Sequence, residues 1–85
     1  MTLYKFKKLT ELEQSILVWK EGAFVGQKSE GVYKVVLFQV ASFYVEVYFN
    51  TEEKRYDHLR PFSSTVQLKD YLAQIDITEI LNKTH

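Results

Sequence analysis

The histidine at position 58 comes nearest, by type and neighbours, to an acid–base site. Histidine is the usual general base in catalysis, and His58 lies within residues 56–60 (YDHLR). If this run is a strand, Tyr56, His58 and Arg60 share one face, where they could bind an anion or move a proton. We favour the simpler interpretation, a polar strand edge that faces solvent. The other histidine, His85, is the last residue and is expected to be solvated.

Glu46 is the one charged residue within the most apolar segment of the chain, residues 43–50 (FYVEVYFN). A carboxyl group buried between Tyr44 and Tyr48 would have a raised pKa, a frequent property of functional sites. We favour the alternative, in which Glu46 lies on an exposed face and pairs with Lys34 across the sheet.

Motifs that bind nucleotides, phosphate or metal ions are absent from the sequence. The chain has no cysteine, which excludes disulfides, thiol nucleophiles and cysteine-ligated zinc. Ser63 and Ser64 precede an apolar segment, where a helix cap explains them better than a nucleophile does. We therefore expect no catalytic residue, no metal and no cofactor, and the sequence identifies no small-molecule ligand.

A weak cluster of basic residues accompanies the last predicted strand. Lys54, Arg55 and Arg60 surround Tyr56, an arrangement that resembles a base-stacking platform. The acidic residues at 52–53 interrupt its positive field, and the chain as a whole has eleven basic and eleven acidic side chains. Since nucleic-acid binders usually carry a basic excess, we keep a nucleic-acid-associated regulator only as an alternative.

Length and hydropathy indicate one small globular domain, residues 1–85. Hydrophobic residues make up 46% of the chain and charged residues 26%, a globular composition. No apolar stretch approaches the roughly 18–20 residues that cross a bilayer, and residues 1–9 do not resemble a signal peptide. We expect a cytoplasmic protein without membrane attachment.

A helix is predicted over residues 10–21. Thr10 and Glu13 have the spacing of a capping box, and Gly22 is placed to end the helix in a left-handed conformation. The apolar residues at helical spacing, expected to face the core, are Leu9, Leu12, Ile16 and Trp19.

Four strands are predicted after this helix. Their ranges are 23–28, 32–40, 43–50 and 54–62. Turn residues at 29–31 and 50–53 and a short connection at 41–42 favour an antiparallel meander. Pro61 cannot donate a ladder hydrogen bond, so it marks an edge or an end.

A second helix is predicted to follow the strands. Residues 64–67 match another capping box, and residues 76–79 open a last short turn. The apolar residues at helical spacing between them are Leu68, Leu72 and Ile75. The predicted fold is α+β and two-layered, in the order α-β-β-β-β-α, with the helices on one face of the sheet.

The other face of that sheet is the predicted interaction surface. Tyr44, Glu46 and Tyr48 alternate with apolar residues along one strand, and Tyr33 and Tyr56 join them if the register allows. Tyrosine is favoured at interfaces because it combines an apolar ring with a polar tip.

Three functions follow from these patterns. The first is a non-enzymatic domain that binds a protein partner or forms a homodimer through the tyrosine-rich face. The second is the nucleic-acid-associated regulator. The third is a small enzyme that uses Glu46 or His58 in a pocket at a dimer seam.

Overall fold

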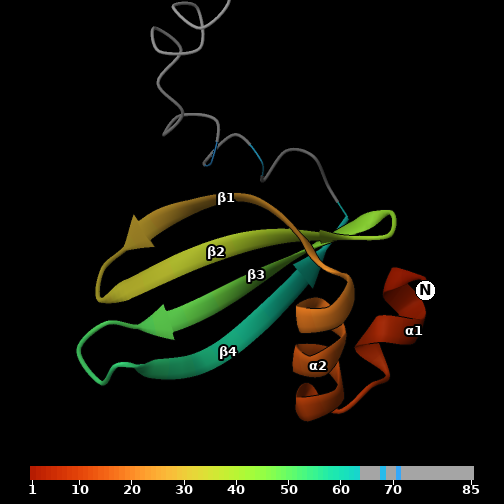
Figure 1. Ribbon diagram of the computed structural model, residues 1–85, viewed down its shortest axis with the longest axis horizontal. Helices are drawn as coiled ribbons and strands as arrows, with labels where there is room; N and C mark the ends of the chain where they lie inside the picture. Colours follow the sequence, from red (N-terminus) through yellow and green to blue (C-terminus); the bar gives the residue numbers. More distant parts are fainter. Residues whose placement is uncertain (64–67, 69–70, 72–85) are drawn as a thin grey trace, which may run out of the picture.

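The computed structural model describes residues 1–63, 68 and 71. Its elements are α1 (Leu3–Lys7), α2 (Glu11–Glu21), β1 (Ala23–Glu30), β2 (Tyr33–Val40), β3 (Phe43–Asn50) and β4 (Arg55–Phe62). The strands form one antiparallel sheet in the order β1-β2-β3-β4, which confirms the predicted meander (Figure 1). The predicted helix and turn after β4 lie outside the described residues, apart from positions 68 and 71.

The capping box of α2 is present as predicted. The Thr10 amide donates to Glu13 Oε1 at 2.9 Å, and the Glu13 amide donates to Thr10 Oγ1 at 3.2 Å. The predicted left-handed Gly22 is wrong, because its φ of −72° and ψ of 137° are extended. Glycine is required there for space, since a Cβ would lie 2.5 Å from the Val18 carbonyl oxygen. The chain therefore passes directly from α2 into β1.

The predicted core face of α2 is also wrong for three of its residues. Leu12, Ile16 and Trp19 are 70%, 47% and 89% exposed. Val18 is buried against the sheet and Leu17 packs beside it. Apolar residues occur on both sides of this helix, so helical spacing alone did not identify the side that the sheet covers.

Strand register assigns the side chains to two faces. Directly opposite residues of antiparallel strands point to the same side, and Leu37, Glu46 and Arg60 are such partners across β2, β3 and β4. We call this side the glutamate face; its members include Val35, Leu37, Glu46, Tyr48 and Phe62. We call the other side the helix face; its members include Val36, Val40, Phe43, Val45, Val47 and Phe49.

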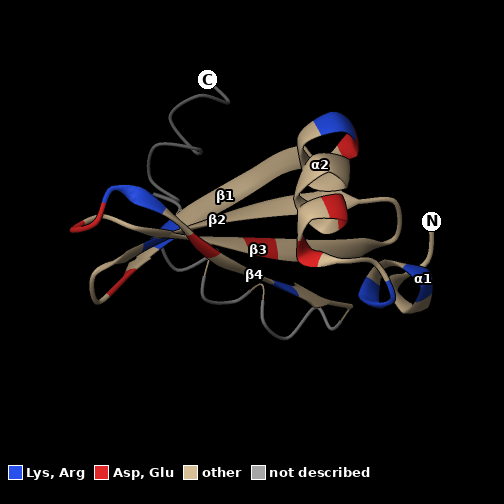
Figure 2. Cartoon of the chain, turned by 90° about the horizontal axis from the view of Figure 1, so that it is seen from below, with Lys and Arg blue, Asp and Glu red and all other residues tan. Residues whose placement is uncertain are grey.

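Among the described residues, the two helices cover one end of the helix face. Phe6 of α1 and Val18 of α2 form a core cluster there with Val40, Phe43 and Val45. The rings of Phe6 and Phe43 have centroids 5.1 Å apart. Figure 2 shows the strands extending well beyond α2, toward the β1–β2 and β3–β4 turns.

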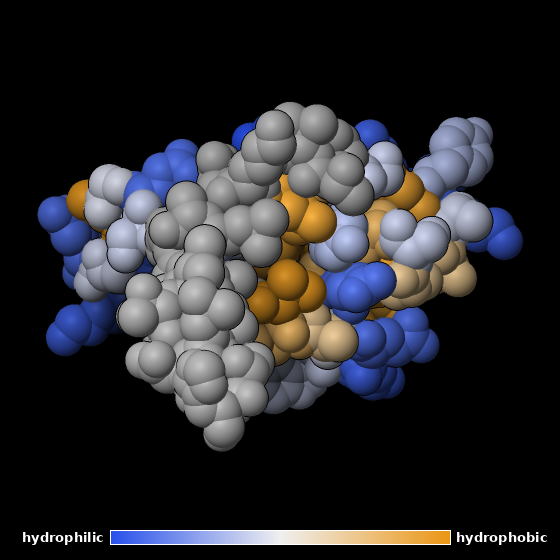
Figure 3. All heavy atoms as spheres, turned by 90° about the horizontal axis from the view of Figure 1, so that it is seen from above, coloured by the Kyte–Doolittle hydropathy of each residue, from blue (hydrophilic) through white to orange (hydrophobic). Residues whose placement is uncertain are grey.

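The glutamate face has a core cluster of its own. Val35, Leu37, Tyr48 and Phe62 are buried there together with Tyr71, and Leu68 packs against them. Figure 3 looks onto this face and shows the apolar side chains gathered at its middle. Tyr71 therefore covers part of the face that the sequence analysis assigned to an interaction surface.

Candidate interaction surface

Glu46 lies at the centre of the glutamate face and is 3% exposed. Its carboxylate accepts a hydrogen bond from the Tyr71 hydroxyl at 2.6 Å. Lys28 Nζ lies 3.6 Å from it and Arg60 Nε 4.0 Å. The favoured exposed position for Glu46 is thus wrong, and Leu37, not Lys34, is its partner on β2. Because two cations and a phenol surround it, this buried carboxylate is compensated from within the chain.

Tyr71 packs against residues of β1 and β3 on the glutamate face. The ring lies beside Gly26 of β1, where an added Cβ would be in ordinary van der Waals contact with it at 3.7 Å. Lys28 Nζ lies 5.0 Å from the ring centroid, a cation–π distance. Burial, together with the hydrogen bond to Glu46, raises the pKa of the Tyr71 hydroxyl above its ordinary value. These contacts tie Tyr71 to β1 and β3.

The predicted tyrosine surface does not form as one exposed patch. Tyr48 is buried and its ring stacks on His58 at 4.2 Å, while the Tyr33 ring meets Tyr48 edge-on at 5.7 Å. The half-buried Tyr44 ring stacks on Phe62 at 5.6 Å. The rings of this face thus pack on neighbours in their own chain.

Tyr56 lies on the helix face instead, opposite Phe49. An irregularity in the β3–β4 register at Tyr48 and Phe49 shifts the alternation, so Tyr56 does not share a face with His58. The Tyr56 hydroxyl donates to Glu11 Oε1 at 2.7 Å, which joins β4 to α2. Burial and this hydrogen bond raise the pKa of Tyr56 to about 12.

His58 is exposed, and its Nδ1 lies 3.3 Å from Asp57 Oδ2. A hydrogen bond from Tyr33 lowers the pKa of the Asp57 carboxyl. His58 and Arg60 both lie on the glutamate face, opposite Tyr48 and Glu46. The histidine therefore lies in a solvent-facing polar strand, as the favoured interpretation expected.

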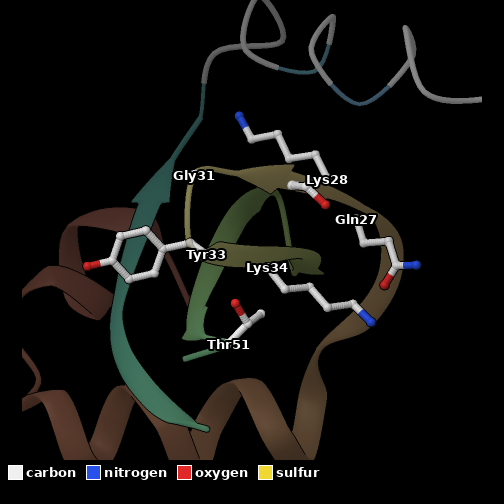
Figure 4. A pocket seen from close by; sticks show the side chains of 7 residues that line it. Gln27, Lys28, Gly31, Tyr33, Lys34 and Thr51 are labelled. Carbon is white, nitrogen blue, oxygen red and sulfur yellow. The ribbon is translucent and has the colours of Figure 1, made fainter. Parts of the chain in front are cut away.

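A polar pocket of about 370 Å³ lies beside the β1–β2 turn. Lys28 lines it from the glutamate face and Lys34 from the helix face, because their partners across the β1–β2 ladder are Val35 and Ser29. Figure 4 shows their ammonium groups pointing in different directions. The two cations therefore do not converge on a single anion position.

The open end of the helix face forms an apolar groove of about 420 Å³. We call it the sheet groove. Its lining residues are Val18, Trp19, Gln27, Lys34, Val36, Phe38, Val47 and Phe49. Phe49, a β3 residue that lines this groove, is 38% exposed. The groove therefore leaves apolar side chains of three elements in contact with solvent.

A row of exposed apolar residues on α2 continues this groove. We call Leu12, Ile16 and Trp19 the helix stripe. Their spacing of four and three places them on one side of α2, and Trp19 also lines the groove. Large contiguous apolar patches are uncommon on monomeric proteins and mark interaction sites. The sequence had singled out these three residues, but as core.

Other features of the described residues add no second site. No group of three histidine or acidic side chains within them is arranged to hold a metal ion. None of the helices in the described ranges has the length and hydropathy to cross a bilayer. Comparisons with protein-family models, with curated proteins and with solved structures gave no match.

Proposed function

We propose that this chain is a non-enzymatic, self-associating interaction domain whose contact surface is the helix stripe together with the sheet groove. The observation that carries the proposal is Trp19, which is 89% exposed at the point where the two surfaces meet. Tryptophan is among the residues most enriched at the energetic centres of interfaces. Burying one removes on the order of 200 Å² of mostly apolar surface from water.

The spacing of the helix stripe supports a contact with another protein. Leu12, Ile16 and Trp19 follow the pattern of anchors by which an amphipathic helix enters an apolar groove. Each is exposed, so the intramolecular core does not account for them.

The glutamate face is a weaker candidate for the same role. Tyr48 and Glu46 are buried in it, and its rings already have partners. Association through the tyrosines would first have to displace Tyr71 from Glu46, which accepts its hydrogen bond at 2.6 Å.

The basic residues of β4 and the preceding turn do not form one platform. Arg55 Nε is paired with Glu53 at 2.8 Å, and Tyr56 is bonded to Glu11. Arg60 lies on the glutamate face, opposite Glu46. Self-association therefore has the stronger support.

The test is the solution mass by light scattering over a concentration series. We expect the mass to rise from 10.1 kDa, the mass of one chain, toward twice that value. Ile16→Glu should hold the chain at the single mass, because it places a charge in the middle of the contact. Tyr4→Ser is the matched control, since Tyr4 is 69% exposed on α1 and belongs neither to the helix stripe nor to the lining of the sheet groove. A wild-type mass of one chain at every concentration would contradict the proposal.

A further inference from the structure

We infer that the occupant of the sheet groove is the helix stripe of a second copy of this chain. Two copies would exchange helices reciprocally, so that each α2 lies between its own sheet and that of its partner. This inference rests on the proposed self-association and adds the geometry of the contact.

Leu12 and Ile16 of the helix stripe point away from the sheet groove of their own chain, whereas Trp19 also lines that groove. Val18 is buried toward the sheet, and Ile16 precedes it by two residues, about 200° around the helix. Leu12 and Ile16 remain exposed beside the other described residues, so we assign their cover to a second molecule. The groove has the complementary requirement, because it is an apolar strip of sheet beside α2 with no helix of the described residues on it.

A twofold axis satisfies both requirements at once. The stripe of one copy enters the groove of the other, and the symmetry repeats the contact in the opposite direction. Helices pack at about 8–10 Å between axes, so the two α2 helices can lie side by side in one layer. The result is a three-layer stack of sheet, helix pair and sheet that covers the stripe and the groove of both copies.

The charges around the two surfaces are complementary. Lys34 is an exposed cation at the rim of the groove. Helix α2 carries three glutamates and one lysine, and Glu13 directly follows Leu12 of the stripe. Glu13 Oε1 accepts from the Thr10 amide, so its other oxygen can face a lysine of the partner. We assign the partner of Lys34 to Glu13 of the second copy.

A second copy fits better than an unrelated helical partner. One molecule of this chain carries both a helix stripe and a groove, and a foreign helix in the groove would leave the stripe uncovered. Only a partner with the same pair of surfaces covers both.

Disulfide trapping tests this arrangement directly, because the chain has no cysteine. Chains carrying Ile16→Cys and chains carrying Phe49→Cys are mixed, oxidised and analysed by peptide mass spectrometry. We expect the disulfide between positions 16 and 49 to exceed both the 16–16 and the 49–49 products. Tyr4→Cys in place of Ile16→Cys is the control and should give little mixed product.

The outcomes separate the two proposals. A dominant 16–16 disulfide would mean that the stripes face each other, which overturns the reciprocal exchange but leaves self-association intact. A wild-type chain that stays monomeric overturns both.

Charge exchange provides a second, independent test. Lys34→Glu alone and Glu13→Lys alone each place like charges together twice in a homodimer. We therefore expect each variant to raise the dissociation constant of the dimer about tenfold. Mixing the two variants creates opposite charges at both contacts and should restore association to within about threefold of wild type. A mixture that associates no better than either variant would overturn the assignment of Glu13.

Glu13→Lys also removes one half of the capping box of α2. Glu13→Gln keeps an acceptor for the Thr10 amide and removes only the charge, so it separates the two effects. It should weaken association less than Glu13→Lys and leave the helix signal in circular dichroism unchanged. Equal loss of association with both variants would contradict the ion pair.

Discussion

The two faces of the sheet differ in how their polarity relates to their burial. The glutamate face contains a carboxylate, a lysine, an arginine and several phenols, yet Tyr71 covers its centre and Glu46 is 3% exposed. The helix face is almost entirely apolar along β3, yet its far end is open and Phe49 is 38% exposed.

The difference shows that polarity along a strand does not by itself identify the solvent side. A charge can be buried when partners compensate it, as Lys28, Arg60 and Tyr71 do for Glu46. Apolar side chains can be left open when their cover comes from another molecule. The helix face is therefore where we place the function, and the glutamate face is where we place internal stability.

The largest effect is expected at the closed end of the helix face. Phe43→Ala should lower the free energy of unfolding by about 3–5 kcal/mol, because it leaves a cavity against Phe6. Phe49→Ala, at the open end, should cost about 1 kcal/mol or less in the dilute monomer. Denaturant titration at low protein concentration measures both. Equal losses would contradict the division of this face into a closed and an open end.

An intermediate effect is expected on the glutamate face. Tyr71→Phe keeps the ring over Gly26 but removes the hydrogen bond to the buried Glu46, so we expect a loss of about 1–3 kcal/mol in unfolding free energy. Tyr4→Phe, which removes an exposed hydroxyl, should change stability by less than about 0.5 kcal/mol. If the two variants were equally stable, the hydrogen bond of Tyr71 would not hold this face closed.

The smallest effect is a loss of stability in alkali. The pKa of Tyr71 is raised in the folded chain, so the unfolded chain releases this proton first. The contribution of the protonated Tyr71 hydroxyl to the free energy of unfolding is fully present below about pH 10, the ordinary pKa of tyrosine. It is lost as the pH rises above that value. Tyr56, with a pKa of about 12, acts in the same direction on the helix face.

Tyr71→Phe should therefore make the decline above pH 10 shallower without abolishing it. Urea titrations at several pH values, read beside tyrosinate absorbance, measure the slope. A slope identical to that of wild type would show that Tyr71 titrates as an exposed phenol, contrary to its burial.

Local interactions were predictable from the sequence. The capping box at Thr10 and Glu13, the bounds of β3 and the antiparallel order of four strands depend on residues close together in the chain. Hydrogen-bonding side chains at fixed spacing and β-branched or aromatic runs specify such elements without reference to the rest of the fold.

Three features depend on contacts between distant residues, and the predictions made from the sequence were wrong for them or left them open. The burial of Glu46 depends on Tyr71, twenty-five residues away. The position of Tyr56 depends on an irregularity in strand pairing at Tyr48 and Phe49, since one extra residue reverses the faces of all that follow.

The third feature is the side of α2 that faces the sheet. Leu12, Ile16 and Trp19 have helical spacing and compete for that position with Leu17 and Val18, which are adjacent in the sequence and lie on another side of the helix. The sequence alone determined that α2 forms and that it has two apolar sides. Only the tertiary structure decided which side is buried, because the choice depends on how Val18 fits against Val40, Phe43 and Val45. That packing is what leaves the helix stripe exposed.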